Sequence, residues 1–377
     1  MKKAKLIAGL CLLLADLSQA APLPGYQLTD LGTLGGAESQ AMGLNDLGQV
    51  VGWSTRNNRP ECLASEQNAP CRYGFVWQQG QMQDLGHAHP DAERTYVVEI
   101  NDDGIMVGYE TDYYPLSGSI TRPIKGDKQG LTLLAVAHEN GGGQAEDINR
   151  QGEIVGCSYD EQGQQNLTVW HGKEMQLHAM DKEYYRRGLG INDSGNLVGY
   201  QYRPYSFRPN SALLYQHHVV SQLSDQSEVW SEAKDINNLG MVAGELASGP
   251  HRPPLAALWL PLLGGEMQTL ELGTLKNYSA SSLRGINDQG VAVGQAWDED
   301  GHARAIIVLQ GKLIDLNTLV SSQWPLISAE DINNYGQIAA TALVNNQMRA
   351  VLLTQSPNQG DPLCRSNRKT CRHRIPQ

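Results

Sequence analysis

The nine residues LNDLGQVVG, at positions 44–52, decide the fold, because a related phrase occurs seven times along the chain. Each copy has Ile or Leu first, Asn second and Gly fifth. The asparagine can hydrogen-bond its own backbone, and the glycine supplies the positive φ that closes a tight turn. Each copy is therefore predicted to be a β-hairpin turn, here named the INDxG turn. The seven asparagines are Asn45, Asn101, Asn149, Asn192, Asn237, Asn287 and Asn333.

Successive asparagines are 43 to 56 residues apart, a period typical of propeller blades. A short apolar strand follows each turn and ends in a second small residue, such as Gly52 or Gly199. Glycine inside a strand indicates close approach of a neighbouring backbone. The seventh copy has Ala340 there, so small size matters more than glycine's conformational freedom.

Each repeat continues with a third and a fourth strand, for example 73–77 and 82–85, as in a propeller blade. The last repeat has a third strand at 349–354 but no fourth. The missing phrase stands at the other end, because 26–32 resembles the fourth strand at 81–86. We therefore expect an all-β, seven-bladed propeller of four-stranded blades, closed by the N-terminal strand completing the last blade. A β-solenoid is the alternative.

The chain is predicted to have three parts. Residues 1–20 read as a secretory signal peptide, with Lys2, Lys3 and Lys5 before an apolar run and a small-residue cleavage site at 18–20. Residues 21–356 form the propeller, and 357–377 form a basic C-terminal tail. We expect an exported protein, periplasmic or extracellular, with no transmembrane span after cleavage.

The charge of the chain limits its partners. The formal net charge is −11, and removing a signal peptide with three Lys and one Asp makes it about −13. Nucleic acid is therefore not an expected partner. The tail runs against this trend, because it contains Arg365, Arg368, Lys369, Arg372 and Arg374.

Export makes disulfide bonds the expected state of the cysteines. Two local pairs, Cys62 with Cys71 and Cys364 with Cys371, give the simplest connectivity. Cys157 lies in a predicted strand, so we expect a buried thiol rather than a nucleophile.

Three phrases give a family resemblance. LTDLGTLGG at 28–36, the pattern S-x-A-x-x-(I/L)-N-D-x-G-x-V-V-G from Ser39, and HARAIIVLQGKLIDLNTL from His302 resemble HAF-repeat proteins, described as probable extracellular repeat proteins. The resemblance implies export and a propeller-like architecture, and it transfers no catalytic residue. The segment 121–138 departs from the pattern because it lacks an aromatic third strand. The pattern therefore does not establish the two outer strands of blade 2.

A carboxylate precedes four of the seven INDxG turns. These residues are Glu99, Asp147, Asp235 and Asp331, and the equivalents in the other repeats are Gly43, Gly190 and Gly285. Such a column would line a central channel. Two interpretations are open: the carboxylates bind a cation, or they accept backbone N–H groups from adjacent blades.

The sequence contains no nucleophile elbow, zinc-binding histidine pair or glycine-rich phosphate loop in usable form, and we expect no metal or cofactor. Tyrosines concentrate instead in the segments expected to form loops opposite the INDxG turns. Tyrosine is an effective contact residue, so the main hypothesis is a non-catalytic module that binds a protein or glycan. A secreted carbohydrate-active hydrolase using channel-facing carboxylates is the alternative. The candidate contact residues are Tyr113, Tyr114, Tyr185, Tyr202 and Tyr205.

Overall fold

The computed structural model describes residues 23–57, 71–114, 118–138, 141–172, 174–178, 183–204, 210–217, 219–224, 230–247, 249 and 252–356. Only the backbone is described at Tyr113, Tyr114 and Gly118. The predicted signal peptide and basic tail therefore lie outside the described residues. No helix in the described part of the chain is long and apolar enough to cross a membrane.

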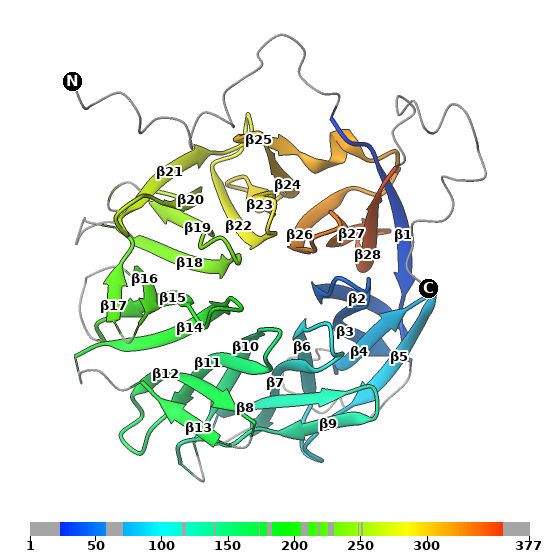
Figure 1. Cartoon of the computed structure of the whole chain (residues 1–377). Coiled ribbons are helices and arrows are strands. Elements are labelled where there is room, and N and C mark those ends of the chain that lie inside the picture. The colour runs from blue at the N-terminus through cyan, green and yellow to red at the C-terminus, as the bar shows by residue number, and fades with distance from the viewer. Residues whose placement is uncertain are drawn as a thin grey trace, which may run out of the picture.

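Seven four-stranded antiparallel sheets surround a central axis (Figure 1). The predicted seven-bladed propeller is confirmed. Blade 1 consists of β2 (Gly35–Leu44), β3 (Val50–Arg56), β4 (Tyr73–Gln78) and β5 (Gln81–Gly86). Blade 2 consists of β6 (Arg94–Ile100), β7 (Met106–Tyr114), β8 (Gly118–Asp127) and β9 (Gly130–Leu133). Blade 3 consists of β10 (Gly143–Ile148), β11 (Glu153–Tyr159), β12 (Gln165–His171) and β13 (Glu174–Leu177).

The remaining blades repeat the order. Blade 4 consists of β14 (Tyr185–Ile191), β15 (Leu197–Tyr202), β16 (Ser211–Gln216) and β17 (Val219–Gln222). Blade 5 consists of β18 (Trp230–Ile236), β19 (Val242–Ala247), β20 (Leu255–Pro261) and β21 (Met267–Gly273). Blade 6 consists of β22 (Ala280–Ile286), β23 (Ala292–Trp297), β24 (Ala303–Leu309) and β25 (Lys312–Asp315), followed by the 3-10 turn η3 (Leu316–Leu319). Blade 7 consists of β26 (Leu326–Ile332), β27 (Ile338–Val344), β28 (Gln347–Gln355) and the N-terminal β1 (Tyr26–Gly32).

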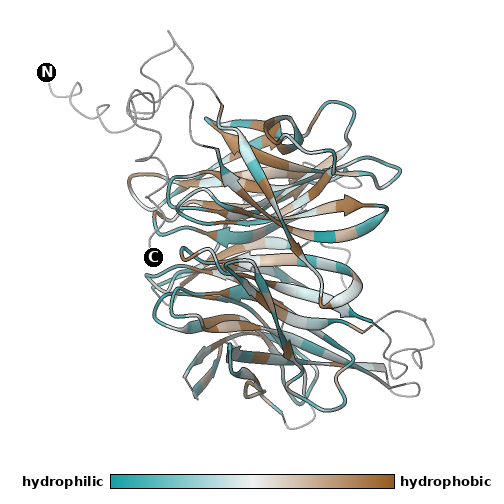
Figure 2. Cartoon of the chain, turned by 90° about the vertical axis from the view of Figure 1, so that its right-hand side faces the viewer, coloured by the Kyte–Doolittle hydropathy of each residue, from teal (hydrophilic) through white to brown (hydrophobic). Residues whose placement is uncertain are grey.

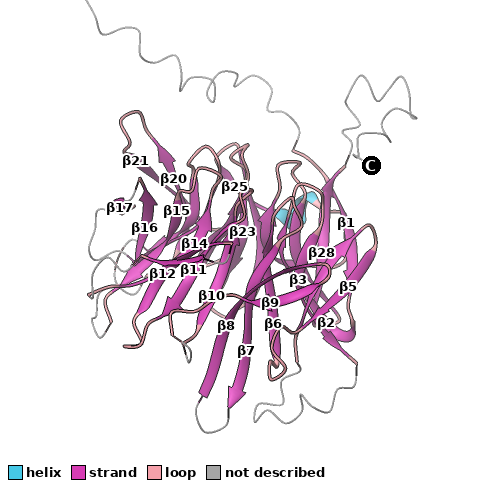
Figure 3. Cartoon of the chain, turned by 60° about the horizontal axis from the view of Figure 1, so that its bottom comes forward, coloured by secondary structure: helices cyan, strands magenta, loops and turns pink. Residues whose placement is uncertain are grey.

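The first strand of each four-strand series lies nearest the axis (Figure 1). The INDxG turns join the first strand to the second, so all seven lie at one end of the axis, here named the turn face. The connections between second and third strands, and those between blades, lie at the opposite end, the loop face. In Figure 3 the hairpin of β7 and β8 extends farther than its neighbours toward the loop face.

Blade 2 is complete although its third strand lacks the expected aromatic residue. β8 pairs with β7 and with β9, and Ile124 in β8 is fully buried. An aliphatic side chain therefore takes the position of Phe75 in blade 1, because Ile124 and Phe75 both lie opposite the second glycine of their repeat.

The apolar core lies between blades rather than at the centre of the ring. Seven clusters of buried side chains each combine residues of two adjacent blades, so both faces of every sheet are covered. Seen from the side, apolar segments lie within the successive strands and hydrophilic residues are common in the loops (Figure 2). The central channel is lined by many charged and amide side chains, with apolar residues such as Met42, Val98 and Leu189 between them.

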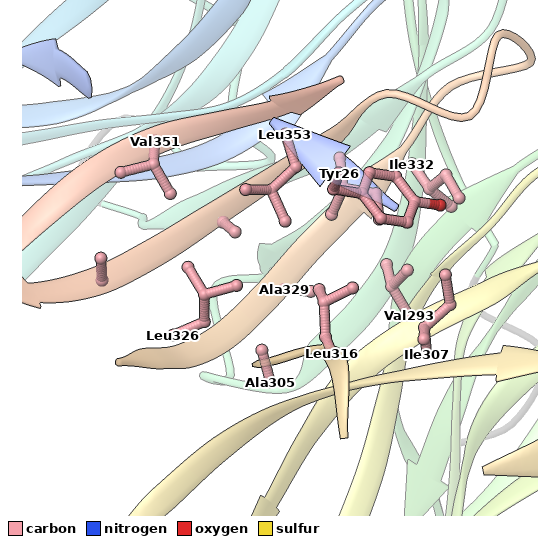
Figure 4. Packing of buried hydrophobic residues seen from close by; sticks show 13 residues of the cluster. Tyr26, Val293, Ala305, Ile307, Leu316, Leu326, Ala329, Ile332, Val351 and Leu353 are labelled. Carbon is pink, nitrogen blue, oxygen red and sulfur yellow. The ribbon is translucent and has the colours of Figure 1, made fainter. Parts of the chain in front are cut away.

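The closing strand behaves as the sequence predicts. β1 pairs with β28 from Tyr26 opposite Gln355 to Gly32 opposite Ala350. Tyr26 is 3 % exposed and packs in one cluster with Leu353, Ile332 and the blade 6 residue Ile307 (Figure 4). The first strand of the chain thus removes the free edge that β28 would otherwise present.

The serine of the S-x-A phrase joins neighbouring blades. Ser39 Oγ donates to Gly32 O at 2.6 Å and accepts the N–H of Ala350 at 3.0 Å. Ser281 makes the equivalent bonds to Gly273 O and from Ala256 N. The innermost strand of one blade is therefore hydrogen-bonded to the outer strands of the blade before it.

Candidate functional site: the central channel and the loop face

The asparagines of the INDxG turns form a closed ring of seven side-chain hydrogen bonds. Asn45 Nδ2 donates to the carbonyl of Asn101 at 3.0 Å, and each following asparagine donates to the next. Asn333 completes the circuit by donating to Asn45 O at 3.0 Å. The intermediate bonds are 2.9–3.2 Å long. Each blade is thus bonded to the next around the turn face.

A second, incomplete ring follows at the next position of the turn. The side-chain oxygen of Asp102, for example, accepts the N–H of Asp46 at 2.9 Å, and Asn238 accepts that of Asp193. Six of the seven turns make this bond. Blade 3 supplies no acceptor because Arg150 occupies the position. Asp and Asn are interchangeable here because both present a side-chain oxygen.

Three aspartates bridge the innermost strands of adjacent blades. Asp235 accepts the N–H of Ile236 and, from blade 6, that of Ile286, both at 2.7 Å. Asp147 bridges blades 3 and 4 in the same way, and Asp331 bridges blades 7 and 1. Of the two open interpretations, the one in which carboxylates accept backbone N–H groups is confirmed for these three residues.

Glycine occupies the other three positions of this column, where space is short. A methyl group at Gly43 would lie 2.8 Å from both carboxylate oxygens of Glu99, and one at Gly285 would lie 3.0 Å from Asp331 Oδ1. Each glycine leaves room for the carboxylate of the following blade. Among the described side chains, no three of these carboxylates come close enough together to hold one metal ion directly.

Packing four acids around one axis changes their proton affinity. Burial raises the pKa of Asp147, Asp235 and Asp331 to about 7, and the charges of the other carboxylates add to the effect. The backbone N–H bonds act in the opposite direction. Burial and the charges of Asp331 and Asp147 raise the pKa of Glu99 well above its usual range. At neutral pH this ring is therefore partly protonated.

Toward the loop face the channel is lined by ion pairs. Arg187 pairs with Glu146, and Arg284 Nη1 lies 2.9 Å from Glu330 Oε2. Lys234 also lines the channel, and its Nζ lies 2.6 Å from Oε1 of the buried Glu245. Tyr200 also faces the channel, and burial raises its pKa to about 12. Together with the carboxylate ring and the asparagines, these side chains enclose a cavity of about 520 Å³.

An aromatic corner in blades 1 and 2 adjoins this charged section. The Arg72 guanidinium lies 3.9 Å from the ring centroid of Trp53, and its Nη1 donates to Tyr96 Oη at 2.9 Å. Tyr96 in turn stacks on Tyr109 with centroids 5.0 Å apart. Of these four side chains, Tyr109 lines the channel, so the stacked rings connect the channel wall with the contact between Arg72 and Trp53.

Sequence reasoning missed Glu146, Lys234, Arg284 and Glu330. They occupy the residue before the carboxylate column, and a strict two-residue alternation would turn them away from the axis. A β-bulge at this point of each innermost strand, such as that between Ala145 and Asp147, lets consecutive residues face the channel. The sequence did carry a signal for these residues, because a charged residue occupies the same position in the predicted innermost strands of four repeats.

Two of the five predicted contact tyrosines are brought together. Tyr185 in β14 is paired directly with Tyr202 in β15, and their rings meet edge to face with centroids 5.4 Å apart. Both side chains are half-buried. Nearby, the Arg203 guanidinium lies 5.1 Å from the Tyr184 ring centroid and pairs with Glu183. We name Tyr184, Tyr185, Tyr202 and Arg203 the tyrosine patch.

The expectation that these tyrosines lie in loops is wrong for four residues that the structure describes. Tyr113 and Tyr114 end β7 and pair with Ser119 and Gly118, Tyr185 begins β14, and Tyr202 ends β15. Aromatic residues favour strands, and the partner strand continues alongside them, so the pairing extends past the expected strand end. Tyr205 lies outside the described residues.

The cysteines are described only in part. Cys157 is a free, buried thiol in β11, as expected, and burial raises its pKa to about 11. Cys71 is disulfide-bonded. Cys62, Cys364 and Cys371 lie outside the described residues, so the two pairings stay predictions.

Comparison with known proteins adds a likeness of fold. No protein-family model matches the sequence, and no curated protein matches it either. Among solved structures, a prolyl endopeptidase aligns with a TM-score of 0.52 at 9% identity, over 85% of this chain and 51% of that one. A putative TolB from Agrobacterium tumefaciens aligns with a TM-score of 0.45 at 12% identity, over 74% of this chain and 94% of that one. The propeller domain of the trilobed protease from Pyrococcus furiosus aligns with a TM-score of 0.40 at 10% identity, over 74% of this chain and 95% of that one. At such identities the likeness is one of fold alone: this chain is a seven-bladed β-propeller with distant propeller neighbours.

Proposed function

We propose that this protein is a non-catalytic binding propeller of the cell envelope or exterior, with a protein or a glycan as its ligand. Export, and a place among the HAF-repeat proteins, belong to the same proposal. They rest on the signal-like residues 1–20 and on the seven repeated phrases. The contact surface would be the loop face, centred on the tyrosine patch.

The observation that carries this proposal is the arrangement of Tyr185 and Tyr202. Both rings are partly exposed at the end of a rigid β-hairpin, and each is oriented by its contact with the other. Preorganised tyrosines lose little entropy on binding and offer both an apolar ring and a hydroxyl. Tyr184 and Arg203 extend the patch with a guanidinium that is already positioned. Such a surface suits hydroxyl-rich or polar ligands.

The channel carboxylates support the alternative, a hydrolase, less well. A pKa of about 7 would suit a general acid at neutral pH, which is the one feature in its favour. However, both oxygens of Asp235 already accept backbone N–H groups of two blades. A residue so placed holds the ring together, and its substitution would disturb the fold before it informed on catalysis.

The experiment compares the chain from Ala21 with its Tyr202→Ala variant in a pull-down from envelope and culture-supernatant extracts, and on a glycan array. We expect one ligand to bind the parent chain and to bind the variant at least tenfold more weakly. The reason is that the Tyr202 ring supplies a large share of a small contact surface.

Tyr335→Ala is the matched control. Tyr335 is 64% exposed but lies in an INDxG turn on the turn face. Equal retention of the ligand by Tyr202→Ala and by the parent, with both proteins folded by circular dichroism, would reject the tyrosine patch as the contact surface. Turnover of a glycoside or peptide substrate by the parent would favour the hydrolase instead.

A further inference from the structure

The described chain ends on the turn face. β28 runs from the loop face to the turn face, and the Gln355 side chain lies against Gly336 of the seventh INDxG turn. The 21 residues that follow Ser356 therefore start there (377 − 356). They include five arginine or lysine residues between 365 and 374, in a chain whose net charge is −11.

The turn face has a groove between blades 1 and 2. Its volume is about 560 Å³, and its walls come from the INDxG turn of blade 2 and from the outer hairpins of both blades. Asp102, Asp103 and Asp127 line it, against a single basic residue, Lys128. Leu47, which is 60% exposed, forms part of its inner rim.

The groove continues into the mouth of the channel. Asp102 lines both cavities, and its side chain accepts the N–H of Asp46, another acid at the mouth. Asp193 and Asp288 occupy the equivalent position in blades 4 and 6, and only blade 3 has a base there, Arg150, which pairs with Asp193. The negative charge of the turn face is thus concentrated at and beside the axis.

We propose that this groove, hereafter the acidic groove, is a docking site for the basic C-terminal segment of the same chain, residues 357–377. The guanidinium and ammonium groups would lie against Asp102, Asp103 and Asp127, with Leu47 providing apolar contact. This inference does not depend on the function proposed for the loop face.

The chain length permits this contact. Blade sheets pack about 10 Å apart, so the groove lies about 20 Å from blade 7, where the described chain ends. Arg365 is nine residues beyond Ser356 (365 − 356) and can reach about 30 Å when extended. The segment therefore reaches the acidic groove by crossing blade 1 only.

The chain itself suggests a conservative variant. Asn238 and Asn334 occupy the position of Asp102 in other blades, and each accepts the neighbouring N–H at 2.9 Å through its amide oxygen. Asp127 accepts the N–H of Gln129, a bond that an asparagine also makes. The triple variant Asp102→Asn, Asp103→Asn, Asp127→Asn therefore removes three charges while keeping the hydrogen bonds.

The test uses the full chain and limited trypsin digestion at low ionic strength, followed by intact-mass spectrometry. A docked segment protects its arginines and lysine from trypsin. At low ionic strength we therefore expect cleavage after residue 357 to be at least fivefold faster in the triple variant than in the parent. In the parent, cleavage should be faster at 0.5 M salt than at low ionic strength. The matched control Asp160→Asn, Asp298→Asn, Asp300→Asn removes three carboxylates from loop-face loops and should leave the rate unchanged.

A second measurement uses a synthetic peptide of residues 357–377 and the chain ending at Ser356, which keeps every strand of the propeller. We expect the peptide to bind this shortened chain and to bind its triple variant at least tenfold more weakly. Equal cleavage rates in parent and triple variant, or equal peptide affinity for both, would overturn the proposal. Neither result would bear on the tyrosine patch.

Discussion

Each INDxG asparagine makes three or four hydrogen bonds with one side chain. Asn192 Oδ1 accepts the N–H groups of Ser194 and Asn196, and its Nδ2 donates to Asn237 O in the next blade. No other residue type offers an acceptor and a donor at this distance from the backbone while fitting the turn. One residue thus shapes its own turn and links its blade to the neighbour.

Replacing Asn192 tests this double role. Asn192→Ala removes three bonds at a side chain that is 4% exposed, and it leaves buried backbone groups without partners. We expect the free energy of unfolding to fall by about 2–4 kcal/mol, at about 1 kcal/mol per bond. Urea unfolding measures the change.

Ser194→Ala in the same turn is the control for Asn192→Ala, because Ser194 is exposed. It should change the free energy of unfolding by less than about 0.5 kcal/mol. Comparable losses in the two variants would show that turn propensity, rather than the asparagine ring, stabilises the hairpin.

The second glycine of each repeat acts through space rather than through its dihedral angles. A methyl group at Gly199 would lie 2.0 Å from Arg187 O, and one at Gly156 would lie 1.9 Å from Gln144 O. Neither glycine has a positive φ. The glycines inside these strands indicated the close approach, and Ala340 in the seventh repeat indicated that small size counts for more than conformational freedom.

Between elements, the carboxylate bridges make stability depend on pH. The folded-state pKa of Asp147, Asp235 and Asp331 is raised to about 7 from an ordinary value near 4, so the folded protein binds more protons than the unfolded chain between these values. The protonated carboxyl groups of these three residues make their full contribution to the free energy of unfolding below about pH 4. This contribution is lost as pH rises through 7.

We therefore expect the melting temperature to fall by at least about 2 °C between pH 5 and pH 8, which corresponds to about 1 kcal/mol in a domain of this size. Differential scanning calorimetry measures the shift. Asp235→Asn should melt lower at every pH, because an amide accepts only one of the two N–H bonds, and its melting temperature should vary less with pH. A profile that rises from pH 5 to pH 8 in both proteins would contradict this account.

At the scale of strands, the sequence placed the INDxG turns and the two strands that flank each turn, because the turn chemistry is local. It placed strand ends less well. β7 continues to Tyr114 because β8 pairs with it along its whole length, and the strand preference of Tyr113 and Tyr114 does not by itself show that a partner strand is there. The charged residues beside the carboxylate column were missed for a related reason, since a bulge depends on two strands at once.

For the whole molecule, closure by β1 is the decisive contact. β1 joins residues more than 300 positions away in the sequence, and it buries Tyr26 and Leu31 between blades. Without it, β28 presents unpaired N–H and C=O groups to solvent.

We expect a chain that begins at Leu34, and so lacks β1, to form oligomers or aggregates in size-exclusion chromatography. A peptide of residues 23–33 added during refolding should restore the monomer by supplying the missing strand. A chain that begins at Leu23 keeps β1 and serves as control. Monomeric, fully stable protein without β1 or peptide would show that ring closure does not depend on this strand.

The sequence by itself determined the number of blades, the turn in each blade and the strand that closes the ring, because each of these is written in a repeated local phrase such as LNDLGQVVG. It also placed Glu99, Asp147, Asp235 and Asp331 at one equivalent position. The tertiary structure alone decided that the aspartates bond backbone N–H groups of two blades, that Tyr185 meets Tyr202, and that an acidic groove adjoins the channel. These features join residues from different strands or blades, and their geometry depends on bulges, strand lengths and blade packing that no single stretch of sequence specifies.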